Sequence, residues 1–343
     1  MSSRSDTAVA ATLGLLGTAT LAVPVWLWAR TDGLIGSFRH LPNLNAGDAN
    51  LVGFVAIDLM LLQVLLLARL PWLERAWGRD VLTRRHRRLG YWSFWLMLLH
   101  VYLFALQRAT RDPGNAGRAL WRVFVTDRHM LLATIGTLLL VMVVVTSTYR
   151  ARNRLRYETW HWLHLYAYVG AGLVLPHILI GADLAVGWVA AFWWTFYGVA
   201  VAAILVWRIG RPALVSRRHD LHVSAVRREV PGVVSVEVAG RDLDRLGVAS
   251  GQFLTWRFRG SRGWTRGHPY SLSAAPTSDL LRVTVRGGGD GGDRLATVPV
   301  GARALVEGPY GRPGGHRRRH SRLLLLAAGV GVTPFRARLE DLP

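Results

Sequence analysis

The sequence predicts a multi-domain membrane protein in which a six-helix transmembrane bundle precedes a small antiparallel β-barrel. Two observations indicate this. Apolar residues are concentrated in residues 1–208, where six runs are each about long enough to cross a hydrocarbon core of roughly 30 Å. After Trp207 the pattern changes to short runs in which apolar and polar residues alternate, as is typical of strands with one buried face. With 343 residues, the chain has room for two or three domains.

Composition excludes several classes of function. The formal net charge is +21, but all 42 basic residues are arginine, which indicates a genome-wide habit of composition rather than a surface for polyanions. The sequence contains no RRM, zinc-finger or helix-turn-helix pattern, so no nucleic-acid partner is expected. The absence of cysteine excludes disulfides, cysteine-ligated iron–sulfur clusters and thiolate haem ligation. A bound metal must therefore be held by histidine or carboxylate side chains.

The expected membrane spans share the length and apolar character of transmembrane helices. They are residues 7–29, 51–68, 89–106, 130–148, 160–181 and 184–207. The first run is long for a cleaved signal peptide and is not followed by a clear small-residue cleavage site, so a helix that stays in the membrane is favoured. The sequence therefore predicts a multi-pass protein in contact with membrane lipid.

Arginine in the connections predicts the orientation of the spans. Seven arginines lie in residues 69–88 and four in residues 150–156, whereas residues 181–187 contain none. Because extra arginine marks the cytoplasmic side, we expect the N-terminus, both arginine-rich connections and everything after Trp207 on the cytoplasmic side of the plasma membrane. The five arginines of residues 108–128, on the predicted outer face, run against this assignment.

Four of the twelve histidines form two pairs at two of the spans: His86, three residues before the third span, with His100 on it, and His164 with His177 on the fifth. Fourteen residues at about 100° each return almost to the same face, about 21 Å further along the helix axis. The second pair, thirteen residues apart, spans about 20 Å. Each pair thus places one imidazole near each leaflet, which predicts two stacked sites with one histidine from either helix. Two neutral imidazoles suit a six-coordinate haem iron, an arrangement typical of electron transfer.

The fifth span does not follow this geometry simply. An ideal helix leaves His177 about 140° away from the face of His164, and we expect Pro176 to distort the helix enough to restore alignment. His161 is a competing ligand on the same span, with a larger angular mismatch. Asp58, in the middle of the second span, is interpreted as a neutral or hydrogen-bonded acid facing the bundle, with a proton relay as the alternative.

Two stretches of this region, ARLPWLERAWGRDVLTRRHRRLGYWSFWLMLLH and YETWHWLHLYAYVGAGLVLPH, resemble the ferric reductase-like transmembrane domain that NADPH oxidases and ferric-chelate reductases share. In that family, histidine pairs on the third and fifth helices hold two b-type haems. The resemblance implies that His86 and His164 hold an inner haem and that His100 and His177 hold an outer one.

Five alternating runs separated by turn residues predict the barrel. They are HDLHVSAV, GVVSVEVAG, GQFLTWRF, LLRVTVRG and ARALVEGPYG. The stretch HPYSLSAAP, residues 268–276, resembles the flavin-binding signature of the ferredoxin-reductase superfamily in its NADPH oxidase variant. The resemblance implies that Tyr270 lies along the isoalloxazine and that the Ser271 hydroxyl reaches it, with His268, Pro269 and Ser273 as further flavin-binding residues. An aromatic face and a hydroxyl are what a planar heteroaromatic cofactor needs.

The predicted phosphate-binding turn departs from the family pattern. Where the family has Gly-Asp-x-Thr or Ser, this chain has GGGDGGDRL, with Gly292 in the place of the hydroxyl residue. Backbone N–H groups of this glycine-rich turn, at Gly289 for example, could still bind phosphate, and Arg266 or Arg286 could supply positive charge. FAD is the expected flavin, and FMN is the alternative.

The last stretch, LLLLAAGVGVTPFRARLEDLP, resembles the first strand, glycine turn and helix start of a nicotinamide-binding domain. Gly329, Gly331, Thr333 and Pro334 match the turn of that family. The resemblance implies NADPH or NADH as the electron donor. Because only this first unit is present before Pro343, a separate electron-donor protein is the alternative.

The expected organisation has three parts: a transmembrane haem domain at residues 1–210, an FAD-binding barrel at 215–315 and an incomplete NAD(P)-binding domain at 320–343. The resemblance implies a ferric-chelate reductase or NAD(P)H oxidase-like enzyme. It would pass electrons from a cytoplasmic flavin through two haems to a small-molecule acceptor on the opposite face, either a ferric chelate or dioxygen. The alternatives are a haem-bearing membrane subunit that delivers electrons to a periplasmic partner such as a methionine sulfoxide reductase, and an inactive truncated scaffold.

Overall fold

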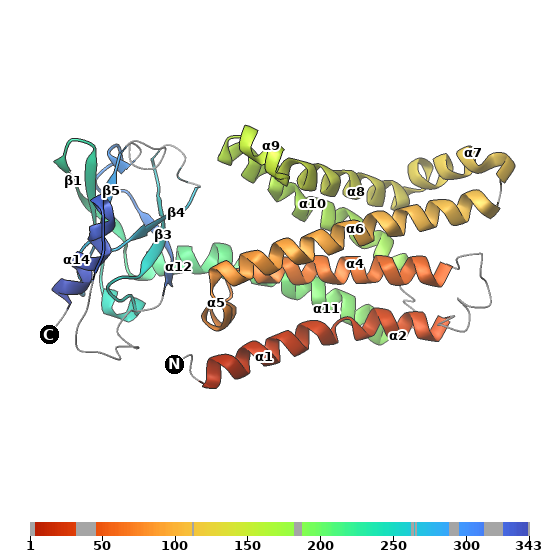
Figure 1. Ribbon diagram of the computed structural model, residues 1–343, viewed down its shortest axis with the longest axis horizontal. Helices are drawn as coiled ribbons and strands as arrows, with labels where there is room; N and C mark the ends of the chain where they lie inside the picture. The colour runs from red at the N-terminus through yellow and green to blue at the C-terminus, as the bar shows by residue number, and fades with distance from the viewer. Residues whose placement is uncertain are drawn as a thin grey trace. The chain divides into compact units, whose positions relative to one another are not determined.

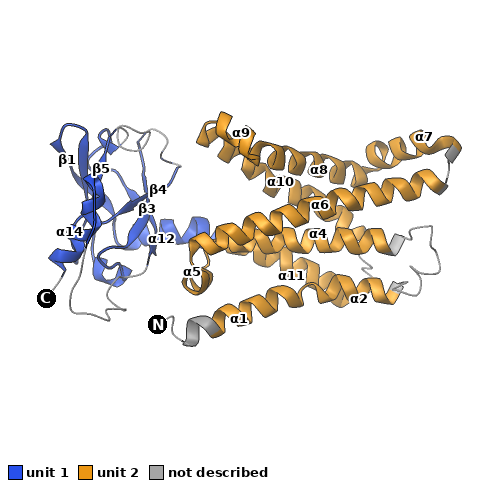
Figure 2. Cartoon of the chain, viewed as in Figure 1, with its two compact units in different colours: residues 1, 205–343 blue, residues 2–204 orange. Residues whose placement is uncertain are grey.

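The structure is a computed structural model with two compact units. It describes residues 4–31, 46–111, 113–181, 187–261, 264, 266–287, 295–311 and 325–341. Residues 2–204 form a helical unit, and residues 205–343 belong to a second unit built around β-strands (Figure 2).

The helical unit is a bundle of long helices with short helices at their ends (Figure 1). Its elements are α1 (Arg4–Ala19), α2 (Ala22–Thr31), α4 (Ala46–Leu66), α5 (Pro71–Trp77), α6 (Arg79–Arg111), η1 (Pro113–Asn115), α7 (Ala116–Trp121), η2 (Arg122–Thr126), α8 (Arg128–Ser147), α9 (Tyr149–Arg154), α10 (Tyr157–Gly181) and α11 (Gly187–Ala203). Within the described residues, six helical segments are long and apolar enough to cross a membrane. The predicted six-helix bundle is confirmed.

The first span is not one helix, because α1 ends at Ala19 and α2 begins at Ala22. Pro24 lacks the N–H that would bond the carbonyl of Thr20 in a continuous helix. The Thr20 carbonyl instead accepts from Val23 N at 3.3 Å, in a tighter turn. This break lies at the middle of the bundle and brings the Thr20 side chain to α4, where its hydroxyl is 2.9 Å from a carboxyl oxygen of Asp58.

The arginine-rich connections, predicted as loops, are largely helical, and this part of the prediction is wrong. After α4, Arg69 adopts a left-handed conformation (φ 68°) that turns the chain into α5. The next helix, α6, then runs unbroken over 33 residues, well beyond the predicted span 89–106. Arginine is a good helix former, so a high arginine count marks a membrane boundary without marking the end of a helix.

The second arginine-rich connection is also helical, because it contains α9. Residues 108–128, which connect the third and fourth spans, contain α7 and the π-helical segment η2. The sixth span begins at Gly187 in α11 and continues through η3 (Ile204–Gly210) and α12 (Arg211–Arg218). Its predicted start at residue 184 lies outside the described residues.

The long helices associate in pairs, with α6 along α4 and α8 along α10 (Figure 1). Glycines allow the backbones of the second pair to meet. A Cβ on Gly136 would lie 2.8 Å from the carbonyl oxygen of Gly170, and a Cβ on Gly170 would lie 3.0 Å from that of Gly136. Close contact at small residues is a common way for helices to associate in lipid. The position of α10 against α8 is therefore fixed at this point.

The second unit contains two three-stranded antiparallel sheets, with strand orders β1-β2-β5 and β4-β3-β6. The strands are β1 (His222–Val230), β2 (Val233–Ala239), β3 (Phe253–Phe258), β4 (His268–Ser271), β5 (Leu280–Arg286) and β6 (Ala304–Tyr310). Single bridges, His222 to Arg303 and Leu272 to Val283, join one sheet to the other. All five runs predicted as strands overlap one, and the predicted small antiparallel barrel is confirmed.

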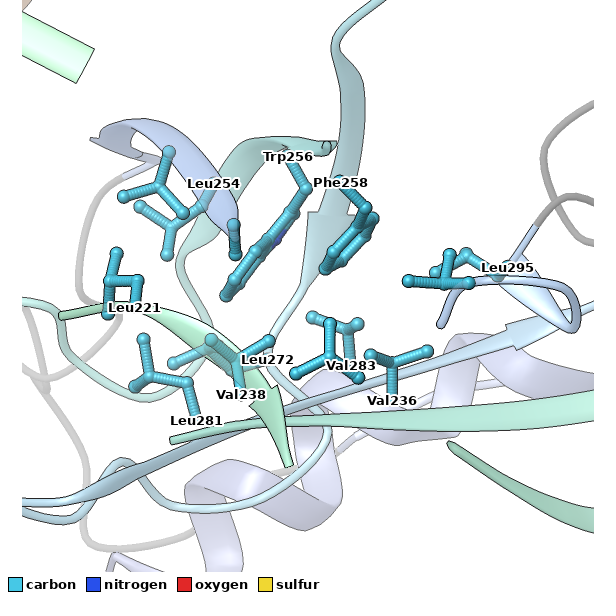
Figure 3. Close-up of a cluster of buried hydrophobic side chains, with 14 of the residues drawn as sticks. Leu221, Val236, Val238, Leu254, Trp256, Phe258, Leu272, Leu281, Val283 and Leu295 are labelled. Atoms are coloured by element: carbon cyan, nitrogen blue, oxygen red, sulfur yellow. The ribbon is translucent and has the colours of Figure 1, made fainter. Parts of the chain in front are cut away.

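One apolar core lies between these sheets (Figure 3). The side chains alternate inward along each strand, as in Val236 and Val238 on β2 or Trp256 and Phe258 on β3. The two β3 rings stack with centroids 5.9 Å apart and planes 8° apart. This core fixes β3, and β3 in turn positions β4, which carries the HPYS sequence.

The C-terminal part of the chain contains a short 3₁₀ turn, η5 (Gly329–Val332), and helix α14 (Thr333–Glu340). The strand expected before the glycine turn is absent from residues 325–328, which have no regular structure, and its earlier residues lie outside the described ones. A strand needs a neighbour to satisfy its backbone groups. Among the strands that the structure describes, none pairs with this segment. The expected helix is present.

Candidate functional site

The four membrane histidines form two pairs across α6 and α10. The rings of His86 and His164 have centroids 6.2 Å apart with planes at 58°. The rings of His100 and His177 have centroids 6.1 Å apart with planes at 50°. We call these the inner pair and the outer pair.

These separations fit a metal shared by two imidazoles. Such a metal lies about 2.0–2.1 Å from each coordinating nitrogen, and the ring centre is about 1.1 Å behind it, so the two ring centres are about 6.3 Å apart. Both observed values are within about 0.2 Å of this estimate. No group of three or more His, Cys, Asp or Glu side chains able to hold a metal occurs among the described residues. A pair of histidines alone suits the two axial positions of haem better than a bare ion.

Helix α4 orients one histidine of each pair. His86 Nδ1 lies 3.0 Å from the carbonyl oxygen of Gln63, and His100 Nδ1 lies 2.7 Å from that of Ala49. A carbonyl only accepts, so each Nδ1 must carry the hydrogen and donate it. The Nε2 lone pair of each neutral ring is then available to a metal, which is the usual outer-shell arrangement of a metal-binding histidine.

A serine on α8 orients His164. The Ser147 hydroxyl donates to the carbonyl of Val143 at 2.6 Å. With its one hydrogen used, it can only accept from the Trp160 indole N–H at 3.2 Å and from His164 Nδ1 at 3.2 Å. His164 is thereby set in the same tautomer as His86. Sequence analysis missed Gln63, Ala49 and Ser147, because two of them act through the backbone and serine has no distinctive spacing.

On α10, the structure brings His164 and His177 to α6 despite their unfavourable spacing. Pro176 lies inside the helix, where it cannot donate to the carbonyl of Gly172, so the helical turn before His177 is free to deform. The competing residue His161 takes a different place: its ring stacks on Tyr157, with centroids 5.8 Å apart and planes 7° apart.

A cavity of about 360 Å³ extends along the outer pair, within the range of small-molecule sites. Residues of α4, α6, η2, α8 and α10 line it, among them both outer histidines, Phe54, Met97, Phe124 and Val174. Two of its polar lining side chains donate to backbone carbonyls: Ser93 to that of Ala56 at 2.9 Å, and Thr134 to that of Met130 at 2.7 Å. The walls therefore offer a flat ligand an apolar surface with imidazoles from two sides.

Gly53 on α4 makes the outer pair possible. A Cβ at this position would lie 2.7 Å from His100 Nδ1, closer than real side chains approach. Only glycine lets α4 come close enough for the carbonyl of Ala49 to reach the same nitrogen. The sequence shows Gly53 only as one glycine in an apolar run, so its role was not predicted.

In the second unit, β4 carries the predicted flavin-binding residues. His268 and Tyr270 lie two residues apart on the same face of the strand and stack with centroids 5.9 Å apart and planes 6° apart. The Trp256 indole N–H donates to the carbonyl of Tyr270 at 3.3 Å, and Pro269 is exposed on the other face. The arrangement provides a pair of parallel rings on a strand that is held by the core.

The two serines of the motif differ in their surroundings. Ser271 is partly exposed at the end of β4, where it pairs with Phe253 of β3. Ser273 is buried, and its hydroxyl accepts from Thr284 at 2.8 Å. The Ser273 side chain therefore contributes to the interior of the barrel in this structure, while Ser271 is placed nearer the surface.

The predicted phosphate-binding residues are only partly described. Arg266 lies two residues before β4, and Arg286 is exposed at the end of β5. Gly289 and Gly292 lie outside the described residues. The roles of these four residues stay predictions.

Helix α14 begins at the GVGVTP turn. Gly329 has a positive φ of 55°, and the Thr333 hydroxyl donates to the carbonyl of Val330 at 2.8 Å. Gly331 lies in the 3₁₀ turn, and Pro334 occupies the first turn of the helix, where no N–H is needed. These residues form a compact start to the helix.

Glu340 at the other end of α14 reaches the flavin-motif segment. It accepts from the backbone N–H of Ala275 at 3.1 Å and from Arg336 Nε at 2.8 Å. The Ala275 N–H above all, and then Arg336, lower the pKa of the Glu340 carboxyl. The helix that follows the nicotinamide-type turn is thus hydrogen-bonded to the predicted flavin segment.

Comparison with known families places the membrane part of the chain. Residues 52–175 match the family described as "Ferric reductase like transmembrane component". This region of the chain is similar to that family. It contains His86, His100 and His164, and His177 follows two residues beyond its end.

The relatives are NADPH oxidase-type proteins. Respiratory burst oxidase homolog protein F of Arabidopsis thaliana is 33% identical over 98 residues, which cover 22% of this chain and 10% of that protein. Human dual oxidase 1 is 25% identical over 348 residues, covering 92% of this chain and 22% of that protein. The chain thus spans between about a tenth and about a fifth of the length of these relatives.

A flavohemoglobin from Malassezia yamatoensis, solved with bound FAD and heme, has 14% sequence identity and a TM-score of 0.30 over 85% of this chain and 69% of its own. A score this low does not indicate a common fold.

Proposed function

We propose that the chain is a transmembrane oxidoreductase that carries electrons from a cytoplasmic flavin through two b-type haems to an acceptor on the opposite face of the membrane. The observation that supports this most strongly is the presence of two histidine pairs on the same two helices, each with the ring separation of a shared metal. The two histidines of α6 are fourteen residues apart, so the sites are separated by about 21 Å along that helix.

The protein's own residues would hold, orient and insulate the cofactors. His86 and His164 would hold the inner haem, and His100 and His177 the outer one. A haem held by two imidazoles would supply one-electron transfer. The Nδ1 hydrogen bonds keep three of the rings neutral and correctly turned, and the apolar walls of the outer cavity exclude water from the path.

The flavin would bind on β4, with Tyr270 along its ring system and Ser271 at its edge. FAD is proposed, with FMN as the alternative, and NADPH or NADH as the source of electrons. The similarity of residues 52–175 to a ferric reductase-like family supports a ferric chelate as acceptor, and the oxidase names of the relatives support dioxygen. The arginine distribution supports a multi-pass plasma-membrane protein with this flavin on the cytoplasmic side.

Haem content tests the histidine assignment. In the protein purified in detergent, we expect two haems per chain by the pyridine haemochrome assay, one in His100→Ala and two in the matched control His161→Ala. His161 is a histidine of α10 that stacks on Tyr157. Two haems retained in His100→Ala would refute the pairing. Absence of haem from the unsubstituted protein would refute the proposed function.

Reduction by different donors tests the rest of the path. We expect NADPH or NADH to reduce the haems when FAD is present, and ferric citrate or dioxygen to reoxidise them. Reduction by dithionite but not by either nicotinamide would contradict a nicotinamide donor and favour a separate electron-donor protein. A reduced protein that neither acceptor reoxidises would contradict both proposed acceptors and favour a partner protein at the outer face.

A further inference from the structure

Asp58 is a fully buried carboxyl group in the middle of α4, with 0% of its surface exposed. Neither histidine pair uses it. Its oxygen Oδ2 lies 2.9 Å from the hydroxyl of Thr20, at the break between α1 and α2. Its other oxygen, Oδ1, has no hydrogen-bond partner among the described residues. A charged carboxylate in such a place would be expensive, because among the described residues only one hydroxyl contact and no ion pair could compensate the lost hydration.

The hydrogens available around Thr20 favour the protonated state of this carboxyl, because one hydroxyl hydrogen faces two acceptor oxygens. The Thr20 hydroxyl also lies 2.8 Å from the carbonyl oxygen of Gly17. A hydroxyl has one hydrogen and a carbonyl has none, so Thr20 must donate to Gly17 for that contact to be a hydrogen bond. The contact with Asp58 is then a hydrogen bond only if the carboxyl carries a proton on Oδ2 and donates it to Thr20.

Four other titratable groups on helices that pack against α4 have partners other than Asp58. On α6, His86 and His100 donate to carbonyls of α4 itself. On α2, the guanidinium of Arg30 lies over the Trp26 ring at 5.4 Å, and on α11 the Tyr197 hydroxyl donates to the carbonyl of Ala171 at 3.5 Å. Within the described part of the chain, no basic side chain forms an ion pair with Asp58.

We propose that Asp58 is a proton-binding site inside the bundle, held as a neutral carboxylic acid that donates to Thr20. The position of Asp58 on α4 links its protonation state to the two haem sites, a link that rests on the function proposed above. Asp58 lies between Ala49 and Gln63, whose carbonyls orient the outer and inner histidines, about 13 Å and 8 Å away along the helix. A negative charge there would oppose the arrival of an electron at either haem, and the bound proton removes that charge.

Infrared spectroscopy tests the proton directly. We expect the protein at neutral pH to show the carbonyl stretch of an undissociated carboxylic acid, and Asp58→Asn to lose it. The matched control is Asp48→Asn, which alters a carboxyl on the same helix that accepts from the Trp28 indole at 3.0 Å and should leave the acid band in place. The proposal is overturned if Asp58→Asn leaves the carboxylic-acid carbonyl band unchanged. It is also overturned if the band that this variant loses lies at the frequency of an ionised carboxylate.

Two further measurements separate this proposal from the electron path. Asp58→Asn should keep the thermal stability of the protein, since a carboxamide can donate to Thr20 as the acid does. It should also leave both haem reduction potentials unchanged, because both side chains are neutral. A rise of either potential in Asp58→Asn would mean that the native group is charged, and would overturn the proposal. If the protein bound no haem, the proposed function would fail, while the infrared result would still decide the state of Asp58.

Discussion

The inner and outer histidine pairs have nearly the same ring separation but are held in different ways. Both inner rings have hydrogen-bond acceptors on neighbouring helices, the Gln63 carbonyl for His86 and the Ser147 hydroxyl for His164. In the outer pair, His100 bonds the carbonyl of Ala49, while none of the described residues hydrogen-bonds the ring of His177. The inner site is thus set by hydrogen bonds from both sides. The outer site depends on packing, on Pro176 and on the cavity that adjoins it.

The largest expected effect comes from removing the α10 ligand of either pair. We expect His164→Ala and His177→Ala each to bind one haem in place of two, and the double variant to bind none, since each iron would lose an axial nitrogen. The pyridine haemochrome assay gives the count, and redox titration shows which centre is left. If His177→Ala kept two haems, the outer site would have another ligand on α10.

A methyl group at Gly53 should affect the outer site alone. The Cβ of Gly53→Ala would press on His100 Nδ1, and overpacking of this kind typically costs about 1–3 kcal/mol. We expect weaker binding of the outer haem, measured by haem transfer to an excess of apomyoglobin, with the inner haem unchanged. Gly198→Ala is the matched control, because a Cβ there meets no atom within 4 Å. Equal loss of both haems would show that Gly53 supports the bundle as a whole.

Removing the Ser147 hydroxyl should affect the inner site alone. Ser147→Ala removes the hydroxyl that lies 3.2 Å from His164 Nδ1, and losing such an outer-shell partner typically costs about 10–100-fold in metal affinity. The same haem-transfer assay should show faster loss of the inner haem. Thr146→Ala is the control, because among the described residues that hydroxyl bonds only carbonyls of its own helix, at 2.8 and 3.1 Å. Matching behaviour of the two variants would rule out an orienting role for Ser147.

Much of the architecture could be predicted because it depends on local patterns. Apolar length predicts the spans, alternation predicts the barrel strands, and the fourteen-residue spacing of His86 and His100 predicts their common face. These signals lie within single elements and do not depend on neighbours. The helical character of the arginine-rich connections was not predicted, since arginine content indicates the membrane boundary and not the conformation of the backbone.

What could not be predicted depends on contacts between elements. The acceptors of His86 and His100 are backbone carbonyls of α4, and whether they reach the rings is decided by how closely α4 and α6 approach. The facing of His177 toward His100 depends on how the turn before Pro176 deforms. The proximity of Thr20 to Asp58 likewise requires the break in the first span, which no single-helix pattern shows.

The contact between Gly136 and Gly170 lies between the two histidines of α10. Gly170 is six residues after His164 and seven before His177, and it packs closely against α8. An insertion or deletion of one residue on one side of this glycine contact would turn only the histidine on that side, by about 100°. The inner and outer sites can therefore change separately in the course of evolution, and a homologue that has lost one pair can keep the other intact.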